Sequence, residues 1–302
     1  MRAQRIVYAL NPNSGQGLRG DDAIFAEGVE LATGETFTQL HQATEHSLAN
    51  GADVLIVQGG DGMASMGAEL AAKHGIPLGV VPTGTGNDFA RSVGIPRGKP
   101  GELRTRLISS LKDGTAKFRT VDLLRLEVDG VKRVAVNSVN IGFDALVNER
   151  ANEKRHLRGT ARYLVALVQS VRDFRSDAFS YAIDGGQPQS LDAEVVTVTN
   201  GRTVGGGIPL VPDARPDDGK LDVIVVSGLN RLGLSLLFPS ALVGLHRFLP
   251  PVKLLTGTTA RIDVPAGVPI YADGECIRSS DAKAGSTVEI TIDPGALRLV
   301  RA

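Results

Sequence analysis

The sequence predicts the α/β fold class, with an N-terminal open α/β nucleotide-binding domain followed by a C-terminal antiparallel β-sandwich domain. Two apolar runs in the first half, at residues 54–57 and 77–81, each end in a glycine-rich turn, which is typical of buried parallel strands. Beyond Asp122, apolar and polar residues alternate around short turns, which is typical of antiparallel strands. We therefore expect a domain boundary near residue 123.

The composition is that of an intracellular enzyme rather than a nucleic-acid-binding or secreted protein. The 33 basic and 33 acidic residues among 302 cancel, which argues against a nucleic-acid partner. A single cysteine, Cys276, permits no internal disulfide, and no signal peptide precedes the first expected strand, so we expect the cytoplasm. No apolar run reaches the roughly 18–20 residues that span a bilayer, so no spanning helix is expected.

The first domain is expected to begin with a strand at residues 5–10, a helix at residues 21–31, a strand at residues 36–40 and a short helix at residues 44–50. Residues 11–17 form a loop of turn residues, and Gly15, Gly17 and the following Gly20 match the pattern G-x-G-x-x-G. These glycines follow a proline and do not start directly after the strand. The spacing therefore favours a plain phosphate-contacting or structural loop over a dinucleotide fingerprint.

Two glycine loops follow neighbouring buried strands of this domain. The first is Gly59-Gly60-Asp61-Gly62, before a helix at residues 64–73, and the second is residues 82–88, where Asn87 or Asp88 is placed to cap the next helix. Because parallel strands end at the same edge of a sheet, the loops should converge on a phosphate site. Asp61 would repel a phosphate unless a cation or a proton transfer requires it. No P-loop sequence is present.

The second domain is expected to open with strands at residues 123–128 and 131–139, joined by Asp129-Gly130, a strong hairpin signal. Further strands are expected at residues 178–183, 194–199, 221–226, 260–264, 268–272 and 288–292, with helices at residues 162–174 and 231–248.

Two charged segments of this half allow more than one interpretation. A basic run comprises Arg150, Lys154, Arg155, Arg158 and Arg162. It is either a solvated face or a contact for anionic lipid or ATP phosphate. The acidic turn at residues 212–222 is either solvated or a site for a hard cation.

Five short motifs occur in order along the chain: Asn11-Pro12-x-Ser14-Gly15, Gly59-Gly60-Asp61-Gly62, Pro82-x-Gly84-Thr85-x-Asn87-Asp88-Phe89-Ala90, Asp218-Gly219-x-Leu221-Asp222 and Asp273-Gly274-Glu275. Together they resemble the soluble bacterial-type diacylglycerol kinase family, a lipid kinase family that also includes sphingosine and ceramide kinases. The resemblance implies an ATP-binding kinase domain at residues 1–123, a β-rich lipid-substrate domain at residues 124–293, and a tail near residues 294–302 that packs back on the first domain.

The resemblance also implies roles for single residues. Glu275 would take the proton from the lipid hydroxyl, and Asp61 would be the second catalytic residue. The nucleotide would be held by Asn11, Ser14, Gly15, Gly59, Gly60, Asp61, Gly62, Met63, Thr85 and Asn87. Asp61, Asp88 and Asp122 would hold the Mg²⁺ of ATP, and Asp218 with the carbonyls of Arg215 and Lys220 would hold a separate structural Mg²⁺.

The chain departs from the family pattern at two places. Met63 stands where the family commonly has Thr, which removes one hydroxyl near the phosphates. The segment before Val54 is shorter than usual, so the adenine-side threonine of the family is not placed, and Thr44 is only a candidate.

We expect an ATP-dependent kinase that phosphorylates the primary hydroxyl of diacylglycerol to give phosphatidic acid, cytoplasmic and peripheral at a membrane surface. Its contacts with the lipid surface would be the apolar helix at residues 231–248 and the basic run. Another lipid alcohol (a sphingoid base or ceramide), NAD as the acceptor, a non-catalytic lipid- or nucleotide-binding protein, and a homodimer are left open. All four acidic candidates, Asp61, Asp88, Asp122 and Glu275, are present, which argues against a non-catalytic site.

Overall fold

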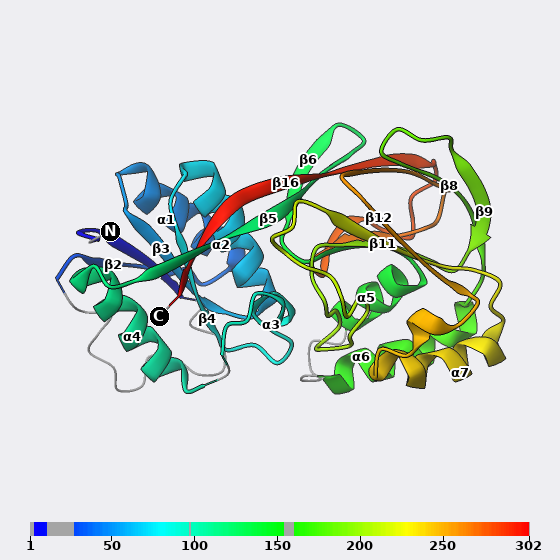
Figure 1. Cartoon of the computed structure of the whole chain (residues 1–302), viewed down its shortest axis with the longest axis horizontal. Coiled ribbons are helices and arrows are strands. Elements are labelled where there is room, and N and C mark those ends of the chain that lie inside the picture. Colours follow the sequence, from blue (N-terminus) through cyan, green and yellow to red (C-terminus); the bar gives the residue numbers. More distant parts are fainter. Residues whose placement is uncertain (1–2, 11–26, 97, 154–159, 302) are drawn as a thin grey trace. The chain divides into compact units, whose positions relative to one another are not determined.

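A computed structural model describes residues 3–10, 27–96, 98–153 and 160–301 of the chain. The chain divides into two compact units, of which the first is Met1–Val121 together with Gly295–Ala302, and the second is Asp122–Pro294. Figure 1 shows the elements of each unit in sequence colours. The mixed α/β class with a β-sandwich second unit confirms the fold class predicted from the sequence.

The first unit is a parallel sheet with the strand order β2-β1-β3-β4-β16 (Figure 1). Its strands are β1 (Ile6–Leu10), β2 (Val29–Ala32), β3 (Val54–Gly59), β4 (Leu78–Pro82) and the last part of β16 (Ser286–Arg301). The last strand returns from the end of the chain and pairs with β4, with Leu299 opposite Leu78. The helices of this unit are α1 (Phe37–Ala49), α2 (Asp61–His74), α3 (Asp88–Ser92) and α4 (Pro100–Asp113).

Helices on both faces explain why β1 and β3 are buried along their whole length. Val54 and Ile56 of β3 share one apolar cluster with Leu107 and Leu111 of α4. Val57 points to the opposite face, where Gly67 lets α2 approach closely. A Cβ built on Gly67 would lie 2.6 Å from the Cγ1 of Val57, so a larger residue would push the helix away from the strand.

Residues 37–40 are helical, so the strand predicted at residues 36–40 is wrong. Thr36 is the N-cap of α1, and its hydroxyl accepts a hydrogen bond from the N–H of Gln39 at 3.2 Å. The Gln39 side chain accepts the N–H of Thr36 at 3.1 Å in return. This capping box starts one continuous helix of 13 residues instead of a strand and a short helix. The predicted helix at residues 21–31 is also wrong at its end, because Val29–Ala32 forms β2.

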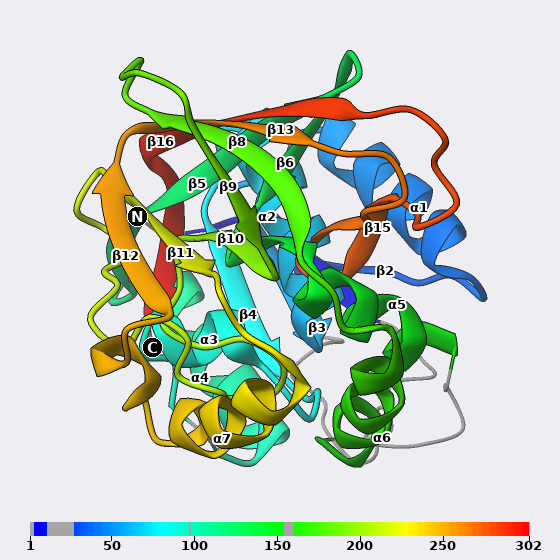
Figure 2. The same cartoon turned by 90° about the vertical axis from the view of Figure 1, so that its right-hand side faces the viewer.

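The second unit contains two antiparallel sheets whose inner faces form one core (Figure 2). One sheet has the order β12-β11-β10-β7-β14-β15, and the other contains β16, β13, β8 and β9, with β5 and β6 beside them. Val139 and Val196 of the first sheet share an apolar cluster with Phe179 and Ile262 of the second. The strands are β5 (Lys117–Val128), β6 (Val131–Ala135), β7 (Ser138–Gly142), β8 (Asp177–Ile183), β9 (Gln189–Ala193), β10 (Val195–Thr199), β11 (Leu221–Val226), β12 (Val252–Gly257), β13 (Thr259–Val264), β14 (Ile270–Ala272) and β15 (Glu275–Arg278).

The predicted hairpin at Asp129-Gly130 is confirmed, because β5 and β6 pair on either side of it. Both residues have positive φ, at 51° and 81°, as a two-residue hairpin turn of this type requires. The strands β9, β12 and β15 were not predicted, since each is short and exposed and lacks the apolar alternation of the inner strands.

The helices of the second unit are α5 (Phe143–Glu153), α6 (Thr160–Ser170) and α7 (Arg231–Leu242), with 3₁₀ turns η2 (Val171–Asp173) and η3 (His246–Phe248). Figure 2 shows α5, α6 and α7 together at one side of the unit. Phe143, Phe174 and Leu234 form the small cluster beneath them, with the two rings edge to face at 4.9 Å. The predicted helix at residues 231–248 is shorter than expected, because Gly244 turns the chain at φ 72°.

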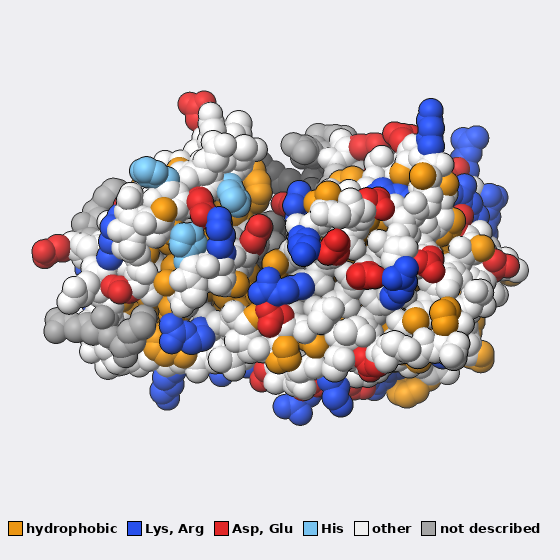
Figure 3. Space-filling view, turned by 90° about the horizontal axis from the view of Figure 1, so that it is seen from above, with side chains coloured by type: hydrophobic (Ala, Val, Ile, Leu, Met, Phe, Trp, Pro, Cys, Tyr) orange, Lys and Arg blue, Asp and Glu red, His pale blue; other side chains and the backbone are white. Residues whose placement is uncertain are grey.

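The surface carries acidic and basic side chains interspersed, as the face in Figure 3 shows for both units. Such a surface agrees with the formal net charge of +0. Among the described residues, no helix is long and apolar enough to cross a bilayer.

Candidate functional site

The two glycine loops of the first unit touch one another at Gly60 and Gly84. The N–H of Thr83 donates to the carbonyl of Gly59 at 2.8 Å, which holds the two strand ends together. A Cβ built on Gly84 would lie 2.5 Å from the Cα of Gly60, so a residue with a side chain cannot occupy position 84 in this geometry. The predicted convergence of the two loops is therefore present in the first unit.

Asp61 connects these loops through its carboxylate. It is the first residue of α2, with Gly60 as the N-cap, so it lies in the first helical turn rather than in the middle of the turn. Its Oδ1 accepts a hydrogen bond from the backbone N–H of Phe89 at 3.1 Å. Phe89 follows Asp88, whose side chain is buried at the start of α3. Two carboxylates thus belong to one pair of loops.

Asn87 stands at the predicted N-cap position of α3, but its side chain makes no capping bond and closes the second loop instead. Its φ is 50°, and its Oδ1 accepts the N–H of Gly84 at 3.0 Å. Its Nδ2 also donates to the carbonyl of Gly84. The side chain therefore fixes the loop from residue 84 to residue 87, and Thr85 between them is exposed.

The N–H of Met63 donates to the carbonyl of Gly60 at 3.1 Å, and its side chain packs into the core. The side chain is buried and fills the space beside Gly59, because a Cβ built on Gly59 would lie 2.2 Å from the Cγ of Met63. Gly62 has open space where a Cβ would be, so the start of α2 can be approached from outside. The first N–H groups of a helix have no partner within it and favour an anion.

Thr44 is not available as an adenine contact. It is fully buried within α1, and its hydroxyl donates to the carbonyl of Leu40 at 2.7 Å. Asn11, Ser14 and Gly15 lie outside the described residues.

Asp122 lies in the second unit, where its carboxylate meets the acidic turn. It accepts the N–H of Gly219 at 2.7 Å, and its own N–H donates to the carbonyl of Pro216 at 2.8 Å. The buried Asp122 therefore anchors the segment between residues 216 and 219. Its assignment to the Mg²⁺ of ATP beside Asp61 and Asp88 stays a prediction.

The acidic turn brings several carboxylates together. Asp218 accepts the N–H of Lys220 at 3.1 Å and is exposed. Burial raises the pKa of Asp222, and the charges of Asp218 and Asp213 raise it further, against the hydrogen bond from Thr256. The structural Mg²⁺ predicted at this turn, with Asp218 and the carbonyls of Arg215 and Lys220 as ligands, stays a prediction.

Glu275 follows a two-residue turn that the rest of the second unit holds in place. Asp273 and Gly274 have φ of 48° and 83° and connect β14 to β15. The Asp273 carboxylate accepts three backbone N–H groups, those of Val136, Asn137 and Ser138, at 2.7, 2.9 and 2.9 Å. Glu275 is exposed at the start of β15.

Two further contacts near Glu275 escaped prediction from the sequence. Asn152 of α5 donates from Nδ2 to the carbonyl of Gly274 at 2.9 Å, and no local pattern points to this residue. The Asp-Gly pair before Glu275 signals a hairpin turn, but the three N–H groups that Asp273 accepts come from a segment more than 130 residues away.

The carboxylate of Asp144, also in the second unit, was not indicated by the sequence. Asn140 donates to it from Nδ2 at 2.6 Å, and the hydroxyl of Thr197 donates to the same oxygen. Burial raises the pKa of Asp144 to about 6, and these hydrogen bonds oppose the rise.

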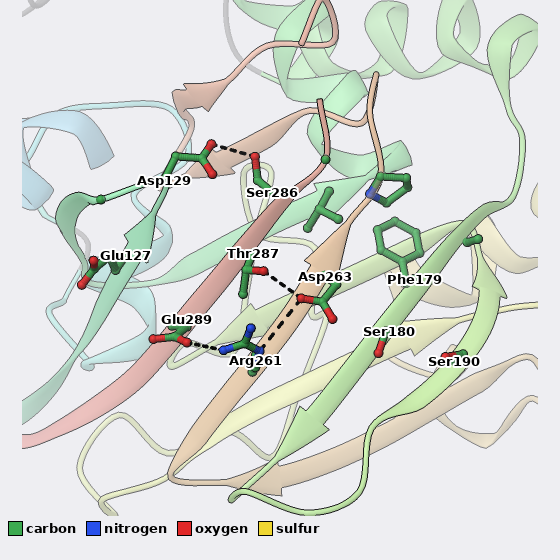
Figure 4. Close-up of a pocket in the computed structure, with 15 residues that line it drawn as sticks. Glu127, Asp129, Phe179, Ser180, Ser190, Arg261, Asp263, Ser286, Thr287 and Glu289 are labelled. Carbon is green, nitrogen blue, oxygen red and sulfur yellow. Dashed lines mark hydrogen bonds and ion pairs between the residues drawn. The ribbon is translucent and has the colours of Figure 1, made fainter. Parts of the chain in front are cut away.

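A hollow of the second unit lies elsewhere, on the outer face of β8, β13 and β16 (Figure 4). It encloses about 700 Å³ and contains the carboxylates of Glu127, Asp129, Asp263 and Glu289. Arg261 is paired with Glu289 at 2.6 Å. None of the predicted site residues lines it, and its acidic lining does not suit a phosphate group.

The first unit belongs to the class of open α/β folds in which neighbouring parallel strands end in glycine loops, and it has no P-loop sequence. A sequence profile described as the diacylglycerol kinase catalytic domain matches residues 5–124. A profile described as the YegS C-terminal NAD kinase beta sandwich-like domain matches residues 137–301.

Two named proteins are similar in sequence to most of this chain, in agreement with the profile matches. "Diacylglycerol kinase" of Mycobacterium tuberculosis is 33% identical over 98% of this chain and 95% of its own length. "Probable lipid kinase YegS-like" of Pseudomonas aeruginosa is 30% identical over 90% of this chain and 85% of its own length. The chain therefore belongs to the diacylglycerol kinase family of lipid kinases, as its motifs predicted.

Solved structures share the fold. A structure from Bacillus anthracis str. Sterne has a TM-score of 0.76 at 22% identity, covering 100% of this chain and 96% of that chain. A second from the same organism, titled a diacylglycerol kinase, has a TM-score of 0.66 at 18% identity and covers 100% and 98%.

Proposed function

We propose that the chain is an ATP-dependent kinase that transfers the γ-phosphate of ATP to the primary hydroxyl of diacylglycerol and so forms phosphatidic acid. The observation that carries this proposal is the contact of the two glycine loops at Gly60 and Gly84, bridged by the carboxylate of Asp61. The Mycobacterium tuberculosis relative, named a diacylglycerol kinase, supports diacylglycerol as the acceptor.

In this proposal residues 1–123 form the ATP-binding domain. The glycines at positions 59, 60 and 62 expose backbone that phosphate oxygens can approach, and Asn87 keeps the second loop in shape. Thr85 is exposed, and its hydroxyl would contact the nucleotide. Asn11, Ser14 and Gly15 keep their predicted part in ATP binding.

The carboxylates of the loop pair fit Mg²⁺. Among the described residues, no group of three or more His, Cys, Asp or Glu side chains could hold a metal ion by itself. Magnesium is usually bound by one or two carboxylates together with substrate phosphates, so Asp61 and Asp88 are a suitable set and Asp122 is the third predicted ligand. The bound ion would neutralise charge on the phosphates during transfer.

Residues 124–293 would hold the lipid, and Glu275 would be the general base. The hydroxyl oxygen of the lipid forms a bond to the γ-phosphorus, the bond between that phosphorus and the bridging oxygen breaks, and ADP leaves. Glu275 takes the hydroxyl proton. Its exposed position after a turn held by three N–H bonds suits a group that must meet substrate from solvent.

The second candidate acceptor is NAD, because the second unit matches a profile described as NAD kinase-like. A third possibility is another lipid alcohol, such as a sphingoid base or ceramide. We propose the cytoplasm as the compartment, with the protein peripheral at a membrane surface.

A radiolabelled-ATP assay distinguishes these acceptors. The purified chain is incubated with Mg²⁺, ATP and either diacylglycerol, a sphingoid base, ceramide or NAD, with the lipids in mixed micelles. Label is expected in phosphatidic acid, and Asp61→Asn serves as the inactive control. Label that moves to NAD alone would show that the lipid assignment is wrong.

A further inference from the structure

Most of the exposed large apolar side chains among the described residues gather on one part of the second unit. They are Leu232, Leu242, Val243, Leu245, Phe248 and Leu249, and they define the α7 apolar face. Leu232, Val243 and Phe248 expose 69, 67 and 70% of their surface. Such a face on a folded protein marks an interaction surface.

The exposed residues of α7 lie on one side of the helix. Leu234 and Leu237 are buried against the rest of the unit. Leu232, Pro239 and Val243 are seven and four residues apart, so they share the opposite side, and all three are exposed. The outer side of α7 is therefore apolar at these three positions.

The turn after α7 holds its apolar side chains outward. The N–H of Leu245 donates to the carbonyl of Ser240 at 2.9 Å, and the N–H of Phe248 donates to the carbonyl of Leu245 at 3.1 Å. His246 is buried between them and its Nε2 lies 2.8 Å from the carbonyl of Leu210. His246 therefore occupies the inward side of this turn, while Leu245 and Phe248 are exposed.

Two arginines, Arg231 and Arg247, belong to the segment that forms this face, and residues 223–262 contain no Asp or Glu. The guanidinium of Arg247 lies 4.7 Å from the centre of the Phe248 ring. Arg247 also pairs with the exposed Asp213, an acid from outside this segment. Exposed apolar residues beside arginines suit the surface of an anionic bilayer.

We propose that the α7 apolar face docks the chain onto the surface of an anionic phospholipid bilayer. Phe248, Val243 and Leu232 enter the boundary between headgroups and acyl chains, and Arg231 and Arg247 meet the phosphates. The 12 residues of α7 span about 18 Å, well short of a bilayer, so the helix lies along the surface. The purpose of docking rests on the proposed function, because a diacylglycerol kinase meets its substrate in a bilayer.

Vesicle cosedimentation tests the docking surface without any need for turnover. The wild type is mixed with vesicles of phosphatidylcholine alone or with about one third phosphatidylglycerol, at low salt and at high salt. The test variant is Val243→Ser with Phe248→Ser. The matched control is Val131→Ser with Phe37→Ser, which removes one valine and one phenylalanine that are also exposed but lie elsewhere.

The wild type and the control are expected to bind the anionic vesicles, with weaker binding at high salt. The test variant should bind roughly tenfold less or weaker still, because two apolar side chains no longer enter the interface. Its melting curve should match the wild type, since both residues are exposed. Equal vesicle binding by the wild type and the test variant would overturn the proposal.

Two further measurements separate this proposal from its rivals. Light scattering reports the oligomeric state. A dimer that dissociates in the test variant while vesicle binding is unchanged would assign the face to a second copy and overturn bilayer docking. Phosphorylation of diacylglycerol in vesicles should fall in the test variant, while phosphorylation of a dissolved short-chain diacylglycerol should not. A wild type that docks through this face but phosphorylates no lipid would overturn the proposed function and leave the docking surface standing.

Discussion

The carboxylate of Asp61 accepts the backbone N–H of Phe89 at 3.1 Å, and this bond joins the start of α2 to the start of α3. It places the carboxylate of Asp61 next to the peptide that follows Asp88. An acidic residue at the first turn of one helix, bonded to the N-terminus of another, is favoured by both helix dipoles. The same position would oppose an anionic ligand unless a cation is bound with it.

Asp61→Asn should lower turnover at least about 100-fold and weaken nucleotide binding in the presence of Mg²⁺. The amide can still accept the N–H of Phe89, so the fold should be retained, but it lacks the charge that a Mg²⁺ ligand needs. Titration calorimetry with a non-hydrolysable ATP analogue measures the binding. Unchanged affinity and turnover would remove Asp61 from the metal site.

Gly84→Ala should disrupt the contact of the two loops. The added Cβ would lie 2.5 Å from the Cα of Gly60, a distance at which backbone must move. We expect weaker ATP binding and a lower melting temperature. Gly98→Ala is the control, since no atom lies within 4 Å of its Cβ position. Equal ATP affinity in both variants would show that the loop contact is not needed for nucleotide binding.

Glu275→Gln should lose at least about two orders of magnitude in turnover, because the amide cannot take the proton. The side chain is exposed, so folding and ATP affinity should stay near the wild-type values. Single-turnover kinetics with diacylglycerol measure the chemical step. Near-normal turnover would leave Asp61 as the leading candidate for the base.

The neighbouring Asp273→Asn serves as a comparison, because Asp273 supports the turn rather than the proton transfer. It should lower the free energy of unfolding by about 1–3 kcal/mol through weaker bonds to three N–H groups. Glu275→Gln should leave that free energy unchanged.

Asp218→Asn should lower the melting temperature and remove the stabilisation that added Mg²⁺ gives to the wild type. The reason is that the acidic turn would lose the side-chain ligand of its predicted cation. Scanning calorimetry over a range of Mg²⁺ concentrations measures both effects. A variant whose melting curve still rises with Mg²⁺ as in the wild type would indicate that the turn is only solvated.

Asp144 should make the stability of the second unit depend on pH. Its pKa in the folded chain is about 6, above its ordinary value of 3.8, chiefly because of burial. The unfolded chain therefore ionises first as the pH rises, and the free energy of unfolding falls between about pH 4 and pH 6, by up to about 3 kcal/mol. Asp144→Asn should lack this fall.

Urea unfolding at pH 4.5 and pH 7 checks this expectation. The free energy of unfolding of Asp144→Asn minus that of the wild type should be larger at pH 7 than at pH 4.5. Parallel stability curves for the two proteins would show that Asp144 has an ordinary pKa in the folded chain.

Much of the fold could be read from local pattern. The run at residues 54–57 is buried in β3, and the Asp129-Gly130 hairpin is in place, because a buried strand must be apolar and a two-residue turn must accept positive φ. The segment at residues 36–40 was misread as a strand. The capping box formed by Thr36 and Gln39 is a signal for the start of a helix, and the strand prediction overlooked it.

The sequence by itself determined the family, the two glycine loops and the acidic residues near them, because each is a short motif of neighbouring residues. Only the tertiary structure decided what those residues contact. Met63 is buried beside Gly59, Asp122 is bonded to Gly219, and Asp273 accepts N–H groups from Val136 to Ser138. These partners are distant in the chain or hidden by packing, and backbone N–H groups carry no signature in the sequence, so only the folded arrangement of the strands specifies them.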